Sequence, residues 1–192
     1  MKKTAIITGG SSGLGKYLCN NLMSNYNIID LSRRSINTPC DITNNESIKN
    51  IIKNIKTVDL LINNAGVMLF NSFPNITEEE FDITFATNVK GTFLVTQSVL
   101  PLMNSNSYII NISSIRGITG CPNKAIYSAS KFALQGMTDS LRKESNGVRI
   151  TNICAGRIPD SVTHLDILKT IKYITSLSNR TIIRDIILGG QL

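Results

Sequence analysis

Tyr127 and Lys131, four residues apart, are the side chains of this sequence best spaced to move a proton. They fall within a stretch of helical apolar spacing near 124–145, where an i,i+4 pair lies on one face. A free phenol titrates near about 10, and a nearby ammonium favours the phenolate and so lowers that pKa. The pair could therefore protonate a developing alkoxide, or take the proton back in the reverse direction. The same spacing also arises by chance on helix surfaces.

Two serines offer a hydroxyl that could polarise a carbonyl group. Ser113 and Ser114 end the apolar run 108–112, which predicts a buried strand, and a loop containing glycine and proline separates them from Tyr127. Reduction of a carbonyl needs a hydride, a proton for the alkoxide and a donor to the carbonyl oxygen. These residues could provide the last two, while the hydride would belong to a bound cofactor.

A glycine-rich turn at residues 8–15, Thr-Gly-Gly-Ser-Ser-Gly-Leu-Gly, joins a strand-like run to a helix-like stretch. Glycines let the backbone turn tightly and approach a pyrophosphate, and the free N–H groups at the helix start add donors and positive potential. Because any sharp turn can use glycines, the turn alone leaves a nucleotide site and a plain turn equally open. The candidate contacts are Gly9, Ser11, Ser12, Gly13, Leu14 and Gly15.

Together these motifs resemble the short-chain dehydrogenase/reductase family. The family's order holds along the chain: TGxxxGxG, then Asn-Asn-Ala-Gly at 63–66, Asn88, Ser114 and Tyr-x-x-x-Lys, with the tyrosine thirteen places after Ser114. The resemblance implies that Tyr127 is the general acid in reduction, that Lys131 also binds the ribose hydroxyls, and that Ser114 donates to the substrate oxygen. It also implies that Asn88 kinks its helix and that its backbone carbonyl holds a water against the lysine.

Strand-like runs alternate with helix-like patterns, which is typical of βαβ units and a parallel sheet. We predict strands near 3–8, 27–32, 36–40, 58–63, 107–113, 147–153 and 182–188. We predict helices near 13–24, 45–55, 78–103, 124–145 and 164–177, the third either continuous or interrupted. The expected fold is α/β: one doubly wound, Rossmann-type domain over residues 1–192, with a mostly parallel sheet of about seven strands and helices on both faces.

The end of the second predicted strand bears on the choice of cofactor. An acid just past this strand would bind the ribose 2′-hydroxyl of NAD, whereas an arginine would pair with a 2′-phosphate. By the resemblance, Ser32 stands where the family usually keeps that acid, and Arg33 and Arg34 follow it. We therefore favour NADP(H), with NAD(H) as the alternative because Asp30 could serve as the acid. The two arginines could also be solvated loop charges.

Further cofactor neighbours follow from the resemblance and from small residues at strand ends. Besides Tyr127 and Lys131, they are Asp41, Ile42, Asn63, Ala65, Gly66, Gly156 and Ile158. Asp41 would bind the adenine amino group, and Asn63 would stabilise the central strands while bordering the cofactor. Ala65 and Gly66 are small enough to let the backbone approach a ligand. We predict no metal site.

The chain departs from the family pattern after the strand near 147–153. Ala155 replaces the usual proline, and Asp160 stands where a threonine is common. Because pyrophosphate would repel an aspartate, we expect Asp160 to turn outward. The substrate loop near 157–164 is short where many members insert a lid, which predicts an open cleft with high KM and broad carbonyl acceptance. His164, the only histidine, is expected to begin a helix rather than to catalyse.

Composition narrows the partners. The 192 residues carry a formal net charge of +7, but the basic residues are scattered and no nucleic-acid module is recognisable, so we expect no nucleic-acid partner. The four cysteines form no CxxC pair, and no stretch approaches the length of a membrane span. We expect a cytoplasmic protein with no membrane partner. Family members commonly pair through their central helices, so a homodimer or homotetramer through 89–103 and 125–145 is also expected.

The expected function is hydride transfer between NADP(H) and a small carbonyl or secondary alcohol substrate by a Ser-Tyr-Lys mechanism. The alternative is a non-catalytic, NADP-binding regulatory or scaffold protein, which would not need the serine, tyrosine and lysine together. Epimerase or dehydratase chemistry on nucleotide sugars is a further alternative, but members of that kind are typically longer and space their glycines differently.

Overall fold

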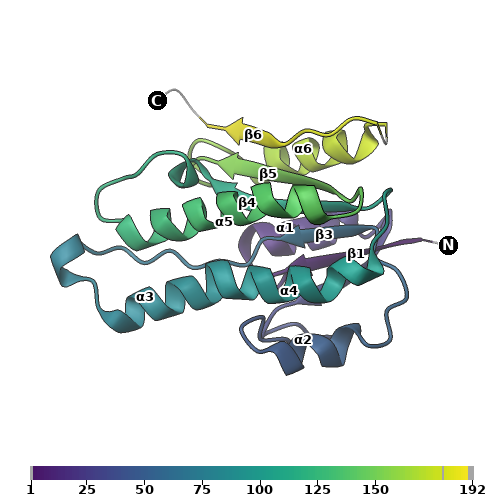
Figure 1. The fold of residues 1–192 in the computed structure, drawn as a ribbon, viewed down its shortest axis with the longest axis horizontal. Helices are drawn as coiled ribbons and strands as arrows, with labels where there is room; N and C mark the ends of the chain where they lie inside the picture. Colours follow the sequence, from purple (N-terminus) through teal and green to yellow (C-terminus); the bar gives the residue numbers. More distant parts are fainter. Residues whose placement is uncertain (1, 179, 190–192) are drawn as a thin grey trace.

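A six-stranded, wholly parallel sheet lies at the centre of the computed structural model, which describes residues 2–178 and 180–189 (Figure 1). The strand order is β2-β1-β3-β4-β5-β6. The strands are β1 Lys3–Thr8, β2 Tyr26–Leu31, β3 Leu60–Asn63, β4 Tyr108–Ser114, β5 Arg149–Ala155 and β6 Asp185–Leu188. The order reverses between β1 and β3, which is where doubly wound folds leave a crevice for ligands.

Helices cover both faces of this sheet. They are α1 Gly13–Leu22, α2 Asn45–Ile52, α3 Glu78–Phe85, α4 Thr92–Val99, α5 Ala125–Glu144 and α6 His164–Ser176. Short 3-10 turns lie at Phe73–Asn75, Leu100–Leu102 and Ile115–Gly117. In the part of the chain that the structure describes, no helix combines the length and apolar character that crossing a bilayer requires. The α/β, doubly wound architecture predicted from the sequence is confirmed.

Alternation along the strands divides the core into two layers. Ala5 and Ile7 of β1 face the α1 and α6 side, whereas Ile6 between them faces the α2 and α4 side. All three side chains are completely buried. Such double-sided burial is what a parallel sheet covered by helices requires, and each isoleucine removed from water contributes roughly 1.5–3 kcal/mol.

The prediction of a third strand at 36–40 is wrong. This segment makes only an isolated bridge between Ser32 and Pro39. Pro39 has no N–H to donate to a ladder, and the Thr38 hydroxyl instead donates to the carbonyl of Asp30 at 2.6 Å. The sheet therefore has six strands rather than seven, and the segment acts as a loop at the edge of the ligand crevice.

The long helix predicted over 78–103 is interrupted by a π-helical segment, Ala86–Gly91. Asn88 lies within it, and its side chain reaches out of the helix to the backbone of Val67. The extra residue in a π turn and the outward amide bonds together account for the interruption.

A file of buried amides crosses the sheet and fixes the position of α5. Asn63, Asn111 and Asn152 occupy paired positions on β3, β4 and β5. Asn63 donates to Asn111 at 2.9 Å, and Asn111 donates to Asn152 at 3.0 Å. Asn111 also donates to the Thr138 hydroxyl of α5 at 2.9 Å. If the strands shifted in register or α5 moved, buried amide groups of this file would lose their hydrogen-bond partners. The file therefore specifies both the register of β3, β4 and β5 and the position of α5 on the sheet.

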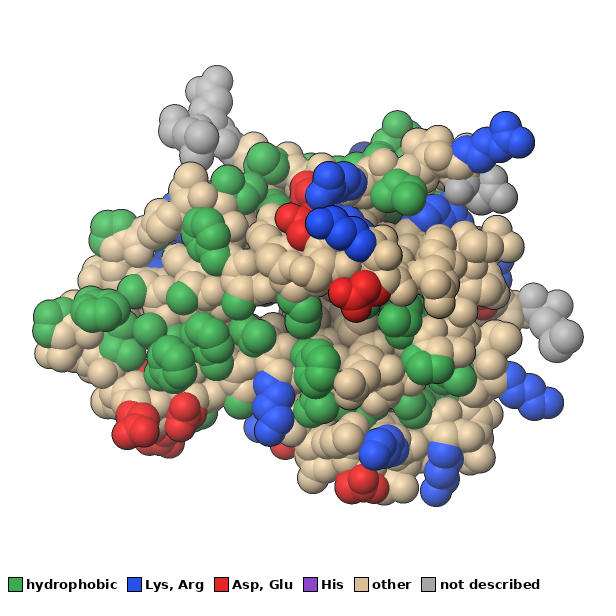
Figure 2. Space-filling view, viewed as in Figure 1, with side chains coloured by type: hydrophobic (Ala, Val, Ile, Leu, Met, Phe, Trp, Pro, Cys, Tyr) green, Lys and Arg blue, Asp and Glu red, His purple; other side chains and the backbone are tan. Residues whose placement is uncertain are grey.

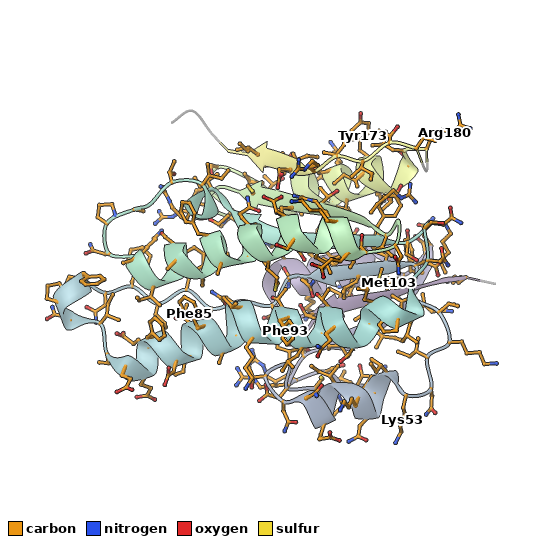
Figure 3. All side chains as sticks on the ribbon, viewed as in Figure 1. Lys53, Phe85, Phe93, Met103, Tyr173 and Arg180 are labelled. Atoms are coloured by element: carbon orange, nitrogen blue, oxygen red, sulfur yellow. The ribbon has the colours of Figure 1, made fainter. Side chains whose placement is uncertain are left out.

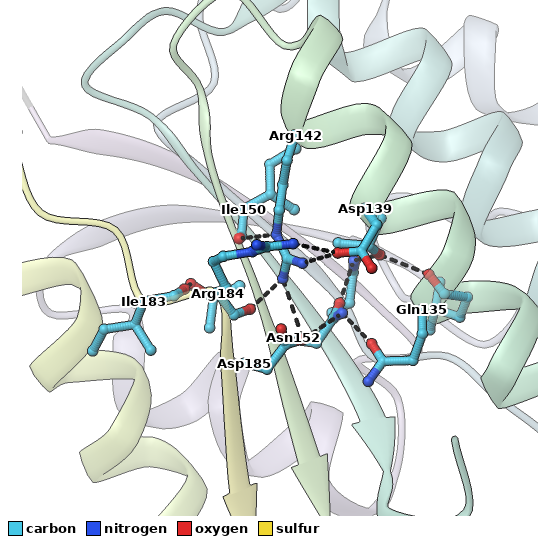
Figure 4. Close-up of polar contacts among 12 residues, drawn as sticks. Gln135, Asp139, Arg142, Ile150, Asn152, Ile183, Arg184 and Asp185 are labelled. Carbon is cyan, nitrogen blue, oxygen red and sulfur yellow. Dashed lines mark hydrogen bonds and ion pairs between the residues drawn. The ribbon is translucent and has the colours of Figure 1, made fainter. Parts of the chain in front are cut away.

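The same file ends in a charged cluster at the edge strand (Figure 4). Asn152 donates to Gln135 of α5 and, at 3.0 Å, to Asp185 of β6. Arg142 of α5 pairs with Asp185 at 3.3 Å and with Asp139 at 2.6 Å. The cluster fastens the short strand β6 to α5, the helix that carries Tyr127 and Lys131.

Candidate active site

Two cavities at the carboxyl ends of the strands form one continuous groove. The first, about 530 Å³, lies over β1, β2 and the loop after β3, and the second, about 550 Å³, lies over β4, β5 and the start of α5. Their walls share four residues, Leu14, Asn64, Gly66 and Val67. A groove of this length at a topological switch point suits an extended ligand such as a dinucleotide.

The glycine-rich turn forms the floor of the first cavity. Gly9 and Gly13 have φ of +71° and +49°, a region that side chains disfavour. A Cβ on Gly15 would lie 2.1 Å from the carbonyl oxygen of Gly9, so only glycine fits there. The Ser12 side chain makes no capping bond to α1. The N–H groups of the first turn therefore remain available for a phosphate, and the turn fits the pyrophosphate of a dinucleotide.

Asp30 is held inside the protein rather than offered to a ligand. Its carboxylate accepts from the backbone N–H of Gly10 and from the Ser32 hydroxyl, both at 2.7 Å, and it lines neither cavity. Arg33 and Arg34 do line the first cavity, are exposed, and form no ion pair with any described residue. The acid that could have favoured NAD is thus engaged, and the two guanidinium groups are free.

Asp41 and Ile42 lie in the wall of the first cavity, and their contact with a cofactor stays a prediction. The pKa of Asp41 is lowered, first by the backbone N–H of Thr43, then by the Thr43 hydroxyl and by the charge of Arg33. The carboxylate therefore stays ionised beside the cavity.

The two asparagines at the carboxyl end of β3, Asn63 within the strand and Asn64 just after it, have opposite orientations. Asn64 lines both cavities, and its side chain donates to the carbonyl of Thr8 at 2.9 Å, while Ala65 and Gly66 line the groove beside it. Asn63 points to the other face of the sheet, where it donates to Thr96 at 3.0 Å, and it lines neither cavity. The structure supports Asn63 as a link between strands but not as a border of the cofactor site, because neighbouring side chains alternate across a strand.

Lys131 is almost fully buried in the second cavity. Its ammonium donates to the carbonyl of Ile112 at 3.0 Å and lies 5.8 Å from the ring centre of Tyr127. Burial lowers the pKa of Lys131 to about 8, because the charged form loses its hydration.

Tyr127 and Ser114 face each other across the same cavity. Burial raises the pKa of Tyr127, and a hydrogen bond with the Ser114 side chain opposes that rise. The expected lowering by Lys131 is therefore not found in the protein alone, because desolvation of the phenolate outweighs the neighbouring groups. Ser113 also lines this cavity, but its hydroxyl has no partner among the described residues, so Ser114 is the serine coupled to the phenol.

Asn88 lies behind the groove rather than in its wall. It is buried and bridges two elements, accepting from the N–H of Val67 at 2.8 Å and donating to the Ser130 hydroxyl at 3.0 Å. Its backbone carbonyl accepts from the Thr92 hydroxyl at 3.0 Å. Asn88 thus positions the loop after β3 against α5. Its predicted contact with a water beside Lys131 stays a prediction.

The segment after β5 closes one end of the second cavity. Gly156 and Ile158 line it, and a short run of turns leads from Arg157 directly to α6. Asp160 is exposed and pairs with Arg157 at 3.3 Å, so it turns away from the groove as expected. His164 is the first residue of α6, as predicted.

Several residues of the second cavity were missed by the sequence analysis. They are Met68, Phe70, Ile115, Arg116, Cys121, Lys124 and Arg157. Arg116 and Lys124 carried a signal, since one lies two residues after Ser114 and the other three residues before Tyr127. The loop after Gly66 carried none, because only the tertiary fold brings it against α5.

Comparison with known proteins agrees with this geometry. A family model described as short chain dehydrogenase matches residues 26–166. An uncharacterized oxidoreductase of Staphylococcus aureus (strain USA300) is 32% identical over 185 residues, which cover 84% of this chain and 80% of the relative. The 3-oxoacyl-(acyl-carrier-protein) reductase FabG of Rickettsia bellii (strain RML369-C) is 32% identical over 189 residues, which cover 84% of this chain and 75% of the relative.

Solved structures show the same fold. A short chain dehydrogenase from Leptospira borgpetersenii with bound NAD+ superimposes with a TM-score of 0.89 at 25% identity, covering 99% of this chain and 92% of that one. Serine dehydrogenase from Escherichia coli gives a TM-score of 0.87 at 23% identity, covering 96% of both chains, which is a likeness of fold.

The fold and the groove define a dinucleotide-binding α/β protein of the Rossmann type. The chain belongs to the short-chain dehydrogenase/reductase family, and it is an NAD(P)-dependent oxidoreductase of that type.

Proposed function

We propose that this protein transfers hydride between NADP(H) and a small carbonyl or secondary alcohol substrate, with Ser114, Tyr127 and Lys131 as its catalytic residues. The observation that carries the proposal is that all three side chains line one cavity, which continues into the phosphate-binding end of the groove. A scaffold protein that only bound the dinucleotide would have no use for this arrangement.

Each residue has a distinct task in the proposed reduction. The Ser114 hydroxyl donates to the carbonyl oxygen and polarises it, and Tyr127 delivers the proton as the alkoxide develops. Lys131, anchored to the carbonyl of Ile112, stabilises negative charge on the phenol oxygen and would hold the ribose. A bound nicotinamide supplies the hydride. In the oxidising direction, Tyr127 accepts the proton from the alcohol.

The preference for NADP(H) rests on the second strand. Asp30 is engaged by Gly10 and Ser32, whereas Arg33 and Arg34 are free to pair with a 2′-phosphate. NAD(H) remains the alternative, and it would have to bind without an acid for its ribose 2′-hydroxyl.

Three further features complete the proposal. The chain acts as a single domain whose short loop near 157–164 leaves the substrate end of the groove open, so we expect high KM values and several accepted carbonyl compounds. It works in the cytoplasm. It assembles as a homodimer or homotetramer through α4 and α5.

The test is to follow oxidation of NADPH by the purified protein against ketones, aldehydes and oxoacyl thioesters. Tyr127→Phe should lower kcat by about 10²–10⁴-fold while leaving the dissociation constant of NADPH within about twofold. Tyr173→Phe, on the exposed face of α6 (Figure 3), is the matched control and should keep full activity. Equal turnover by Tyr127→Phe would remove the phenol from its role, and tight NADPH binding without turnover would favour the scaffold alternative.

A further inference from the structure

The charged side chains in the wall of the second cavity are all basic. Among the residues described there, they are Arg116, Lys124, Lys131 and Arg157, and the wall itself contains no aspartate or glutamate. Lys131 is used by the reaction, and Arg157 is paired with Asp160. Arg116 and Lys124 form no ion pair with any described residue. Two unpaired cations therefore remain in a cavity of about 550 Å³.

Lys124 occupies a position that a helix does not favour for a cation. It is the N-cap residue of α5, its side chain makes no capping bond, and the first turn contains no acidic residue. A positive charge at the N-terminal end of a helix is opposed by the helix dipole. The ammonium lies 4.4 Å from the ring centre of Phe70, which lines the same cavity from the loop after β3. The charge is therefore kept at the cavity wall in spite of the dipole.

Arg116 is fixed in the wall of the same cavity by the turn that carries it. The 3-10 turn Ile115–Gly117 follows Ser114 directly, and the Ser114 hydroxyl accepts from the N–H of Arg116 at 3.1 Å. A Cβ on Gly117 would lie 2.9 Å from the carbonyl oxygen of Lys131, so the turn packs closely on α5. One guanidinium nitrogen donates to the carbonyl of Gly120 at 3.2 Å. The remaining N–H groups stay free to bind an anion.

These cations are separate from the groups that would hold the phosphates of the dinucleotide. The first turn of α1, Arg33 and Arg34 all lie in the first cavity, whose wall includes neither Arg116 nor Lys124. Arg116 and Lys124 instead stand two residues from Ser114 and three residues from Tyr127. An anion bound by them would lie in the cavity of Ser114 and Tyr127 and would belong to the substrate.

We propose that the substrate is an oxo acid, or the matching hydroxy acid, whose carboxylate binds between Arg116 and Lys124 while its carbonyl meets Ser114 and Tyr127. This inference rests on the proposed function, and it adds the chemical class of the substrate. The apolar residues of the cavity, among them Met68 and Ile158, would contact the carbon chain.

The experiment compares 2-, 3- and 4-oxo acids with their methyl esters, using NADPH and the full chain. We expect kcat/KM for the best acid to exceed that of its ester by about tenfold or more, because a charged hydrogen bond is lost in the ester. Arg116→Met and Lys124→Met should each reduce that ratio by about tenfold without changing the KM for NADPH. Lys172→Met, on α6 and outside both cavities, is the control and should keep the ratio.

A second measurement separates the lysine's role from a purely structural one. Lys124→Met should raise the melting temperature, since it removes a cation from the N-terminus of α5, even while the acid-to-ester ratio falls. Equal kcat/KM for acids and esters, or an increase in the KM for NADPH in either variant, would overturn the oxo acid assignment.

If no compound is turned over, a binding measurement still tests the anion site. Calorimetric titration of the NADPH-loaded protein with the acid and with the ester measures binding without reaction. Selective binding of the acid without turnover would support the anion site and refute the proposed function. Binding of neither compound would refute the anion site.

Discussion

The ammonium of Lys131 donates a 3.0 Å hydrogen bond to the backbone carbonyl of Ile112, two residues before Ser114 on β4. This contact joins the first turns of α5 to the carboxyl end of the strand and so fixes Tyr127 opposite Ser114. The side chain is almost fully buried, and the site therefore includes a charge whose hydration has been removed.

Replacing Lys131 by methionine should stabilise the fold at neutral pH and abolish activity. Burial lowers the pKa of Lys131 from 10.5 to about 8, so at pH 7 the folded state bears the cost of a buried charge. We expect the free energy of unfolding to rise by about 1–3 kcal/mol in Lys131→Met at pH 7. Urea denaturation, with enzyme assays alongside, measures both effects.

The pH dependence provides the control for that variant. Between about pH 8 and 10.5 the folded state loses the proton while the unfolded state keeps it, so the wild type gains stability as the pH rises. The difference in the free energy of unfolding between Lys131→Met and the wild type should therefore decrease across this pH range. A variant that is less stable than the wild type at every pH would contradict the burial argument.

Arg33→Ala should weaken the binding of NADPH more than the binding of NADH. The guanidinium lies in the wall of the first cavity without an ion-pair partner among the described residues, and pairing with a phosphate is worth about 1.5–3 kcal/mol. We expect the dissociation constant for NADPH to increase about 10–100-fold and that for NADH to change little, measured by cofactor fluorescence. Arg180→Ala, outside both cavities, is the matched control. An equal loss for both cofactors would show that Arg33 does not read the 2′-phosphate.

Asp30→Ala should weaken the binding of NADPH and of NADH to the same extent. Its carboxylate accepts hydrogen bonds from the N–H of Gly10 and from the Ser32 hydroxyl. The substitution therefore removes support from the glycine-rich turn and does not remove a contact with the ribose. We expect the dissociation constants for NADPH and NADH to rise by a similar factor, about 10–100-fold, because a hydrogen bond to a charged group is worth about 1.5–3 kcal/mol. A loss confined to NADH would instead identify Asp30 as the ribose acid.

Phe93→Glu should dissociate the proposed oligomer. Hydrophobic side chains gather over the α3–α4 side of the molecule (Figure 2), and Phe85 and Phe93 lie along it (Figure 3). Phe93 and Phe132 are 44% and 47% exposed, and a shallow hollow beside Phe93 includes Met137 of α5. Light scattering should report a dimer or tetramer for the wild type and a monomer for the variant. Tyr173→Glu on α6 should leave the assembly unchanged, and a monomeric wild type would refute the proposal.

The order of elements could be predicted because it depends on local patterns. Apolar runs such as Ile109–Ile112 read as buried strands, and the glycine-rich turn and the Tyr127–Lys131 spacing are contained within short stretches of chain. The prediction of a strand at 36–40 is wrong because compatibility with extended backbone is not enough, since pairing also needs the N–H donor that Pro39 lacks.

The position of side chains relative to the sheet was harder to predict. Asn63 and Asn64 look alike in sequence, yet one joins the file of buried amides and the other lines the groove, because the strand ends between them. The direction of the Tyr127 pKa shift also differed from expectation, since desolvation depends on what surrounds the ring and not on its neighbours in sequence.

The sequence by itself determined the family and the alternation of strands and helices, and it predicted Ser114, Tyr127 and Lys131 as the catalytic residues, because each of these conclusions rests on spacing within a segment. Only the tertiary structure decided that the Asp30 carboxylate accepts from Gly10 and Ser32, that Asn88 lies behind the groove, and that Arg116 and Lys124, without ion-pair partners among the described residues, line the same cavity as Ser114 and Tyr127. These contacts are between residues far apart in the chain. Burial, charge pairing and desolvation depend on which loops the folded sheet brings together at one edge, and the sequence of a single segment does not contain that information.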